Sequence, residues 1–465
     1  MEDASRHTQK YIKPHTRIGW LADLESLGRR PGRLAELQDR LGIDTVWLES
    51  GRYHTAGYKL SDEAWQASPF QDWQTRPGLS RHRQVHHLPE TAFPVLPGIL
   101  AGADDTDLLR VSEEAWRLGI KLWGHMGLWS YGGMIYPEFA VRNIFGNEIS
   151  AEEDRWGSCF CPSKPVLNRW LAACLQDCVK RYPLQGIELD HARFLPPASL
   201  PNLLVCACPD CIRQAALLGF DLGGLVQQIQ SSIQRLRNAR ASQIIQVFEK
   251  ADSLLEALDI LMNEQAASRW FSLRALLLSM ALSQIIDGIH QFSEGILELG
   301  IDVFPPSVSM LGGHQYTNLA GLDFFTGGFG IIGWERVGIS ACQKWASFFL
   351  QTWPECDESI VLSQLFRVFG YSGIDLPAHL DDCAKLSPVQ LASLEAKEIA
   401  WIANSRPTGM PVYVPASLPV LGFQGLDIIC QAIVENGLDG IIMAGLEDLS
   451  EGQENEVASA LRILL

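Results

Sequence analysis

Gly186-Ile-Glu-Leu-Asp-His191 has the composition of a short β-strand that ends in charged residues. Side chains alternate between the two faces of a strand, so Ile187 and Leu189 share one face while Glu188 and Asp190 share the other. In a closed parallel barrel, the apolar pair would pack against the outer helices and the acidic pair would point inward. Asp190 would then lie at the C-terminal end of the strand, where barrel enzymes build their active sites.

Seven further segments of this kind alternate with longer helical stretches, a pattern typical of parallel β-α-β units. The eight predicted strands are 17–23, 44–50, 120–126, 186–191, 300–306, one strand within 322–334, 411–416 and 439–444. Amphipathic stretches between them, at helical spacing, include 33–41, 166–182, 340–351 and 426–436. The count of eight predicts an α/β fold, namely a (β/α)8 TIM barrel.

We predict a single barrel domain over residues 16–465, preceded by a polar N-terminal arm of residues 1–15. Two insertions, 51–97 and 129–165, follow predicted strand ends, where long loops commonly form substrate walls. Residues 222–299 are predicted to form a helical elaboration between the fourth and fifth strands, interrupted near 263–267.

The composition excludes several classes of protein. Of the 465 residues, 47% are hydrophobic and 20% are charged, as in ordinary globular enzymes. The net charge of −17 disfavours nucleic acid and anionic lipid as partners. We find neither an apolar signal core at the N-terminus nor a long uncharged apolar run, so we expect a cytoplasmic protein without a membrane partner. The sequence does not predict the oligomeric state.

Other predicted strand ends bring acidic side chains to the same mouth. Alternation along 44–50 points Trp47 and Glu49 inward, and Gly330-Ile-Ile-Gly-Trp-Glu335 delivers Glu335. Glycoside hydrolysis needs one carboxyl group as acid and another as nucleophile or base. Asp190, Glu335 and Glu49 are therefore the predicted catalytic residues.

Aromatic rings with polar edges suit sugar rings, and several lie near predicted strand ends. The predicted substrate-binding residues are Arg193, His191, His125, Trp47, Tyr53, Trp334 and Tyr413. A structural Asp190–Arg193 ion pair is the alternative to a catalytic Asp190. Buried structural roles are equally open for Glu188 and His125.

Eleven cysteines in a chain without a secretory signal favour reduced thiols or a metal site over disulfides. Cys206-Ala-Cys-Pro-Asp-Cys211 follows the fourth strand closely, and Cys159-Phe-Cys161 precedes the helix that leads into it, so we expect five thiols to converge near one edge of the mouth. Cys161, Cys206, Cys208 and Cys211 are the predicted ligands of a structural zinc ion, which prefers four such ligands in tetrahedral geometry. Small buried thiols that pack a loop are the alternative.

Three motifs occur in a characteristic order: Cys161-Pro-Ser-Lys-Pro165, Gly186-Ile-Glu-Leu-Asp-His-Ala-Arg193 and Cys206-Ala-Cys-Pro-Asp-Cys211. In this the chain resembles an uncharacterised family of glycoside-hydrolase-like (β/α)8-barrel proteins, the hypothetical or family-10-type glycosyl hydrolase-like proteins. The resemblance implies a barrel fold and carbohydrate substrates, with Asp190 and Arg193 at the mouth.

These observations lead to a first hypothesis, in which the protein is a glycosidase that cleaves an intracellular glycoside. Its expected partner is a small-molecule carbohydrate or glycoside, and no cofactor is expected to be required. A sugar-acid lyase or isomerase on the same barrel, with His125, His191 or the acidic cluster as base, is the second hypothesis. A non-catalytic carbohydrate-binding barrel is the third.

Overall fold

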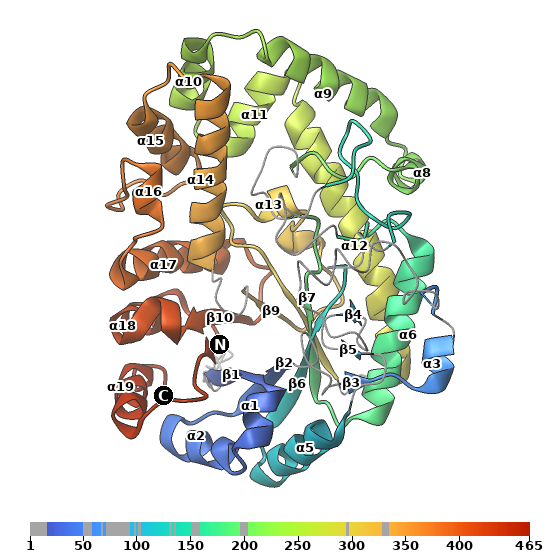
Figure 1. Cartoon of the computed structure of the whole chain (residues 1–465), viewed down its shortest axis with the longest axis vertical. Helices are drawn as coiled ribbons and strands as arrows, with labels where there is room; N and C mark the ends of the chain where they lie inside the picture. Colours follow the sequence, from blue (N-terminus) through green and yellow to red (C-terminus); the bar gives the residue numbers. More distant parts are fainter. Residues whose placement is uncertain are drawn as a thin grey trace, which may run out of the picture.

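The structure is a computed structural model of the whole chain (Figure 1). It describes residues 16–49, 58–66, 68–70, 94–96, 99–100, 104–129, 133, 136–149, 159–195, 203–293, 297–327 and 334–465. The side chains of Glu49, Trp334 and Glu335 lie outside this described part, as does the whole of Tyr53.

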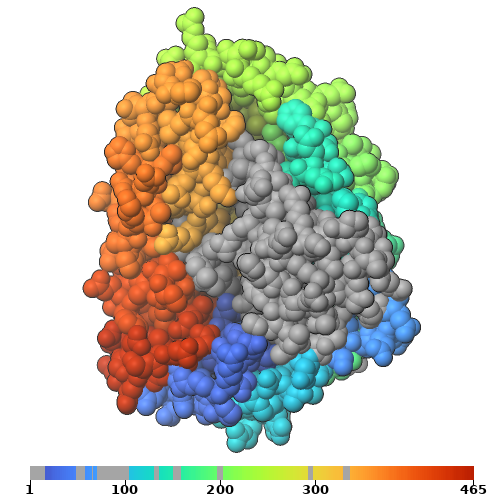
Figure 2. Space-filling view, in the orientation of Figure 1, coloured from blue at the N-terminus to red at the C-terminus, as the bar shows by residue number. Residues whose placement is uncertain are grey.

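Eight parallel strands close into a barrel in the order β1-β11-β10-β9-β8-β7-β6-β2. They are β1 (Arg17–Asp23), β2 (Thr45–Glu49), β6 (Lys121–Gly127), β7 (Gly186–Asp190), β8 (Glu298–Asp302), β9 (Phe324–Thr326), β10 (Val412–Ser417) and β11 (Gly440–Ala444). The chain visits these strands in sequence order around the ring, which confirms the predicted (β/α)8 TIM barrel. β1 pairs with both β2 and β11, and Figure 2 shows the blue and red ends of the described chain side by side.

One predicted strand is misplaced. The strand predicted at 300–306 is β8, which begins at Glu298 and ends at Asp302. Pro305 and Pro306 lie beyond its end, because proline has no N–H to donate to a sheet. The shift moves Asp302 from the interior of the predicted strand to its C-terminal end.

Helices surround the barrel (Figure 1). Outside the segment between β7 and β8, these helices include α1 (Leu24–Arg29), α2 (Arg33–Leu41), α5 (Thr106–Leu118), α6 (Pro165–Arg181), α14 (Trp334–Thr352), α17 (Pro388–Ser405), α18 (Leu418–Asn436) and α19 (Glu451–Leu461). The structure adds α15 (Glu358–Val368) and α16 (Leu380–Cys383) between β9 and β10, two helices that the sequence reading did not identify.

The predicted helical elaboration is present between β7 and β8. It consists of α8 (Pro209–Leu217), α9 (Leu222–Leu236), α10 (Ala241–Lys250), α11 (Leu254–Met262) and α12 (Ala266–Ser293). The predicted interruption is present as well, since Asn263, Glu264 and Gln265 all have positive φ angles. Between β8 and β9 lie α13 (Ser309–Gly312) and η2 (Tyr316–Asn318).

The insertion after β2 contains α3 (Asp62–Gln66) and β3 (Tyr58–Lys59). β3 belongs to a three-stranded sheet of order β3-β5-β4, with β4 (Pro94–Leu96) and β5 (Ile99–Leu100).

Two helices are long and apolar enough to cross a membrane, although charged residues such as Arg274 and Asp427 interrupt them, so neither is the uncharged apolar run that the sequence analysis looked for. Residues 266–291 and 418–436 meet those limits by length and composition. In the structure α12 packs against α6 and α18 packs against α17, and about half of each apolar window is buried, 56% and 44%. This packing explains their apolar composition, because helices buried on several sides need apolar residues on those sides.

The barrel interior contains a layer of large apolar side chains that we call the aromatic floor. Its members are Leu21, Trp47, Trp123, Phe324, Tyr413 and Ile442. The ring centroids of Trp123 lie 4.5 Å from Trp47 and 4.2 Å from Phe324. Glycines make room for these rings: a Cβ atom on Gly19 would lie 2.2 Å from the Trp47 ring, and one on Gly300 would lie 2.0 Å from the Phe324 ring.

Below the aromatic floor, charged side chains close the N-terminal end of the barrel. Arg17 lies with its guanidinium carbon 4.4 Å from the centroid of the Trp123 ring. Its Nη1 donates to Glu298 at 2.9 Å, and Lys121 also contacts Glu298. The floor therefore separates this charged end from the C-terminal mouth.

A buried carboxyl group holds the loop after β8. Glu398 of α17 accepts hydrogen bonds from the Ser307 N–H at 3.1 Å and the Tyr371 hydroxyl at 2.6 Å. Burial raises the pKa of Glu398 to about 7, against the hydrogen bonds from Ser307 and Tyr371, which lower it.

We expect Gly300→Ala to destabilise the protein by about 1 to 3 kcal/mol, because the added methyl group overlaps the buried Phe324 ring. Gly452→Ala in α19 is the matched control, since a Cβ there meets nothing within 4 Å and alanine favours a helix. Urea unfolding of both variants measures the difference. Equal stability of the two would contradict the close packing of the floor.

We expect Glu398→Gln to flatten the dependence of stability on pH. The folded-state pKa of Glu398 exceeds its unfolded value, so its contribution is full below about pH 4.5 and is lost as the pH rises through about 7. The loss approaches about 3 kcal/mol at alkaline pH. Unfolding free energies from pH 4 to pH 9 test this, with the exposed Glu456→Gln as control. A parallel decline in Glu398→Gln and wild type would refute it.

Candidate active site

Four neighbouring strands of the barrel place polar side chains above the aromatic floor. We call His125 of β6, Glu188 and Asp190 of β7, Asp302 of β8 and Thr326 of β9 the mouth cluster; all five are buried. The strand registers explain their proximity, since His125 pairs with Glu188 and Asp302 pairs with Thr326. The predicted inward direction of Glu188 and Asp190 is confirmed by their contacts with His125.

His125 lies between the two carboxylates of β7. Its Nδ1 contacts Glu188, and its Nε2 lies 3.4 Å from Oδ2 of Asp190. Burial by itself lowers the pKa of His125, but the charges and hydrogen bonds of Glu188 and Asp190 hold it well above its ordinary value. The ring is therefore an imidazolium, whose two N–H groups face two acidic side chains.

Both oxygens of Glu188 are engaged within the barrel. The Thr326 hydroxyl donates to Oε1 at 2.9 Å, and Oε2 contacts His125. Burial raises the pKa of Glu188, and the nearby His125 opposes that rise. Glu188 thus orients His125 from below.

Asp190 lies at the end of β7, between two histidines. The His191 N–H donates to Oδ1 at 2.7 Å, and His191 Nδ1 lies 2.7 Å from Oδ2. Burial alone would raise the pKa of Asp190, but the charge of His191 and the hydrogen bonds from His125 and His191 hold it well below its ordinary value. Asp190 is therefore ionised at neutral pH, although it is buried.

His191 has a φ angle of 53°, in the left-handed region that residues other than glycine seldom occupy. Such conformations persist where the surrounding structure enforces them, and they concentrate at functional sites. The turn it makes directly after β7 sets its ring beside Asp190.

Asp302 is a site residue that the sequence reading missed. Burial, followed by the charges of Asp190 and Glu188, raises its pKa well above the ordinary value, and a hydrogen bond to Asp190 acts in the same direction. Asp302 is therefore protonated where Asp190 is ionised. A pair of carboxyl groups with opposed pKa shifts is the usual arrangement for acid–base chemistry.

A signal for Asp302 was present in the sequence. Glu298, Gly300 and Asp302 alternate on one face, as Glu188 and Asp190 do in β7. The predicted strand begins at 300 and ends at 306, so it puts Asp302 in the strand interior and conceals its position at the mouth.

The structural alternative, an ion pair between Asp190 and Arg193, is wrong: within the described part of the chain, Arg193 forms no ion pair with Asp190. Its guanidinium carbon lies 4.7 Å from the centroid of the Phe304 ring, and Nη1 donates to the Phe194 carbonyl at 3.3 Å. The histidines flank Asp190 more closely, which leaves the guanidinium to the aromatic face. Arg193 nevertheless lies close enough to Asp302 to lower its pKa.

His314 ties the loops after β7 and β8 together. Its Nε2–H donates to the Ala192 carbonyl at 3.0 Å, and its Nδ1 accepts from the Phe304 N–H at 2.9 Å. Burial lowers the pKa of His314 to about 4, so the ring is neutral and can serve as donor and acceptor at once. Sequence reasoning did not identify it, because its partners are backbone groups far along the chain.

The remaining predicted residues fall into two groups. Trp47 and Tyr413 are buried in the aromatic floor, where they pack as part of the barrel core. That they contact substrate stays a prediction. Glu49 ends β2 as predicted. Trp334 and Glu335, predicted at the end of a strand, are instead the first residues of α14, because β9 already ends at Thr326. The side chains of all three lie outside the described part. Tyr53 lies outside it altogether.

The four predicted metal-ligating cysteines converge at a separate place. The sulfur atoms of Cys161, Cys206, Cys208 and Cys211 all lie within 4.8 Å of one another and are buried. No residue of the mouth cluster belongs to this group.

No family model matches the chain, and no curated protein sequence matches it. Among solved structures, it is similar to the PgaB (BpsB) glycoside hydrolase domain from Bordetella bronchiseptica, with 12% identity and a TM-score of 0.49 over 97% of this chain and 98% of that chain. It is also similar to the catalytic domain of a β-amylase from Paenibacillus polymyxa, with 13% identity and a TM-score of 0.47 over 96% of each chain. A third similar structure is α-L-fucosidase isoenzyme 2 from Paenibacillus thiaminolyticus, with 10% identity and a TM-score of 0.45 over 96% of this chain and 48% of that chain.

The chain thus spans about half the length of the fucosidase. At such TM-scores these likenesses carry no argument about activity, and the barrel assignment rests on the strand order itself.

We expect His125→Gln to destabilise the fold by about 3 to 5 kcal/mol, because it leaves two buried acidic groups without their cation. The folded-state pKa of His125 is raised, so the difference from wild type should be full below about pH 6.5 and shrink as the pH rises through the raised value. Urea unfolding at several pH values measures it. The exposed His379→Gln is the control, and equal stability of both variants would show that His125 is not charged.

Proposed function

We propose that the protein is a glycoside hydrolase-like enzyme that cleaves an intracellular glycoside with carboxyl groups at the mouth of the barrel. The observation that carries this proposal is the buried pair Asp190 and Asp302, one ionised and one protonated at neutral pH. Glycoside hydrolysis needs an ionised carboxylate as nucleophile or base, which is the state of Asp190, together with a separate protonated acid. The three sequence motifs that resemble glycoside-hydrolase-like barrels agree with this assignment.

Asp190 is the proposed nucleophile or general base. Two histidines keep it ionised inside the barrel, where a carboxylate is otherwise costly to bury. An ionised carboxylate in such a dry site can stabilise the positive charge that develops on the sugar ring, because electrostatic interactions are strong there.

Asp302 is the proposed proton-holding partner of Asp190. Asp302 lies close enough to Asp190 for that carboxylate to raise the pKa of Asp302, so we assign Asp302 a positioning role and not that of the leaving-group acid. Oδ1 of Asp302 has no hydrogen-bond partner among the described residues, so it can meet a substrate hydroxyl group. In this role Asp302 sets the charge of Asp190 and orients the sugar.

Glu335 and Glu49 are the proposed candidates for the acid that protonates the leaving group. In the barrel order, β9, which precedes Glu335, and β2, which ends at Glu49, each lie two strands from β7. Two strand spacings amount to about 10 Å, and inward-pointing side chains reduce that separation. A side chain that points inward from the end of β2 would therefore fall in the range that glycosidases use, which supports Glu49 as a candidate. The reaction needs no cofactor.

One observation favours a second candidate function, a sugar-acid lyase or isomerase. His191 Nδ1 lies 2.7 Å from Asp190, and a carboxylate-oriented histidine is a common general base. Proton abstraction next to a carboxylate would then replace hydrolysis. Hydrolysis in H2¹⁸O puts one ¹⁸O atom into the products, whereas elimination or isomerisation does not.

Turnover of a panel of aryl glycosides and uronides tests the proposal. We expect Asp190→Asn to lower kcat by at least about a thousandfold, because the lost carboxylate acts only in the transition state. Asp302→Asn imitates the protonated carboxyl group and should keep part of the activity. Comparison of Glu335→Gln with Glu49→Gln identifies the leaving-group acid as the residue whose variant loses activity on substrates with poor leaving groups but retains it on substrates with good leaving groups.

Glu298→Gln is the matched control, since Glu298 lies on the same strand as Asp302 but at the opposite end of the barrel. It should reduce stability through its contacts with Arg17 and Lys121 while kcat stays near wild type. Near-normal turnover by a folded Asp190→Asn variant would refute the proposed function.

A further inference from the structure

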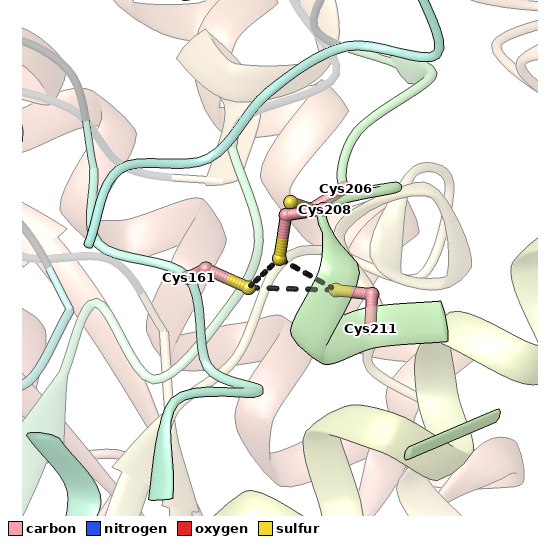
Figure 3. Close-up of side chains that lie close together, drawn as sticks. All are labelled: Cys161, Cys206, Cys208 and Cys211. Carbon is pink, nitrogen blue, oxygen red and sulfur yellow. Dashed lines mark hydrogen bonds between the residues drawn. The ribbon is translucent and has the colours of Figure 1, made fainter. Parts of the chain in front are cut away.

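We propose that Cys161, Cys206, Cys208 and Cys211 bind one Zn²⁺ ion as a closed structural site. Three sulfur–sulfur distances are 3.4 Å for Cys161–Cys211, 3.7 Å for Cys161–Cys208 and 3.7 Å for Cys208–Cys211 (Figure 3). A tetrahedral site with Zn–S bonds of about 2.3 Å places its sulfur atoms about 3.8 Å apart. Three of the four thiols therefore stand almost at the spacing that zinc requires, and the sulfur atom of Cys206 lies within 4.8 Å of each of them.

The same distances exclude disulfides among the three measured pairs, since a disulfide holds its sulfur atoms about 2.05 Å apart. All four side chains are buried, and each sulfur atom lies within 4.8 Å of the other three. With four thiolates in place, zinc has no open position for water or substrate, so the site is structural.

The charges around the cluster suit a metal tetrathiolate. One Zn²⁺ ion and four thiolates carry a net charge of −2, which must be balanced inside a protein. Arg274 of α12 is fully buried beside Cys206 and Cys211, and its Nε and Nη2 have no hydrogen-bond partner among the described residues. Its third nitrogen, Nη1, donates to the Leu203 carbonyl at 2.6 Å. A buried guanidinium in this position is costly unless an anion lies next to it.

Three further features favour thiolates. The Arg142 N–H donates to Cys206 Sγ at 3.4 Å, as a backbone group does to a metal-bound sulfur. Cys211 lies in the first turn of α8, where the helix dipole favours negative charge. Lys164, at the start of α6, supplies a second cation near Cys161 and Cys208, and it also contacts Asp210.

The ion would join loops that follow the strands of the mouth cluster. Cys161 belongs to the segment after β6, and the other three cysteines lie after β7. These segments also meet through the bridge between Asn143 and Val205 and the bond from the Ile144 N–H to the Leu204 carbonyl, 3.0 Å long. Zinc would thereby fix the loops that leave the strands of His125 and Asp190.

Metal analysis of the full chain, purified without added metal, tests the site. We expect one zinc ion per chain by inductively coupled plasma mass spectrometry. Exchange with Co²⁺ should produce the d–d absorption of tetrahedral cobalt together with a thiolate-to-cobalt charge-transfer band. Cys208→Ser should lower the zinc content at least tenfold, whereas Cys430→Ser, at an equally buried cysteine in α18, should leave it unchanged.

Chelation of the wild-type protein covers the case in which Cys208→Ser does not fold. Removal of zinc should expose four additional reactive thiols and lower the melting temperature, and added Zn²⁺ should reverse both changes. A folded, fully reduced wild-type protein that takes up neither Zn²⁺ nor Co²⁺ would overturn the site. Asp190→Asn should keep its full zinc content, so failure of the proposed hydrolase activity is distinguishable from failure of this site.

Discussion

The contact of His125 with two acidic side chains is the interaction on which the site depends. Glu188 and Asp190 point into the barrel because strand alternation leaves them no other direction. Two unpaired carboxylates there would be costly, and the imidazolium between them removes most of that cost. Once Asp190 is ionised in this way, Asp302 beside it retains its proton. The protonation pattern of the mouth cluster thus follows from one buried cation.

The aromatic floor gives this arrangement its dry surroundings. Trp123 and Phe324 precede His125 and Thr326 on the same strands and faces, so large rings fill the barrel directly below the charges. Glycines at 19 and 300 are needed because the rings occupy the volume of their side chains. Low polarity below the cluster strengthens each contact above it. The charged pair of Arg17 and Glu298 lies on the far side of this layer.

Most of the fold could be predicted from the sequence, since strand alternation and helical spacing are local patterns. They located β7 and the inward direction of Glu188 and Asp190 correctly. The spacing of the cysteines similarly predicted which four would meet. Contacts that depend on three-dimensional placement were missed. The end of β8 before Pro305 concealed Asp302, and the stacking of Arg193 on Phe304 excludes the ion pair that was the structural alternative for Asp190. His314 bonds only to backbone groups, which leave no sequence pattern.

The pairing of β1 with β11 has a consequence for how the protein is made. Arg17 pairs with Gly440, so the first strand to be synthesised has no second neighbour until the last strand has emerged. During translation, the open edges of the growing sheet present unpaired N–H and C=O groups to other chains. Large proteins with long-range strand pairing are the ones whose incomplete forms aggregate most readily. The newly made chain therefore depends on protection from aggregation until its final strand closes the ring.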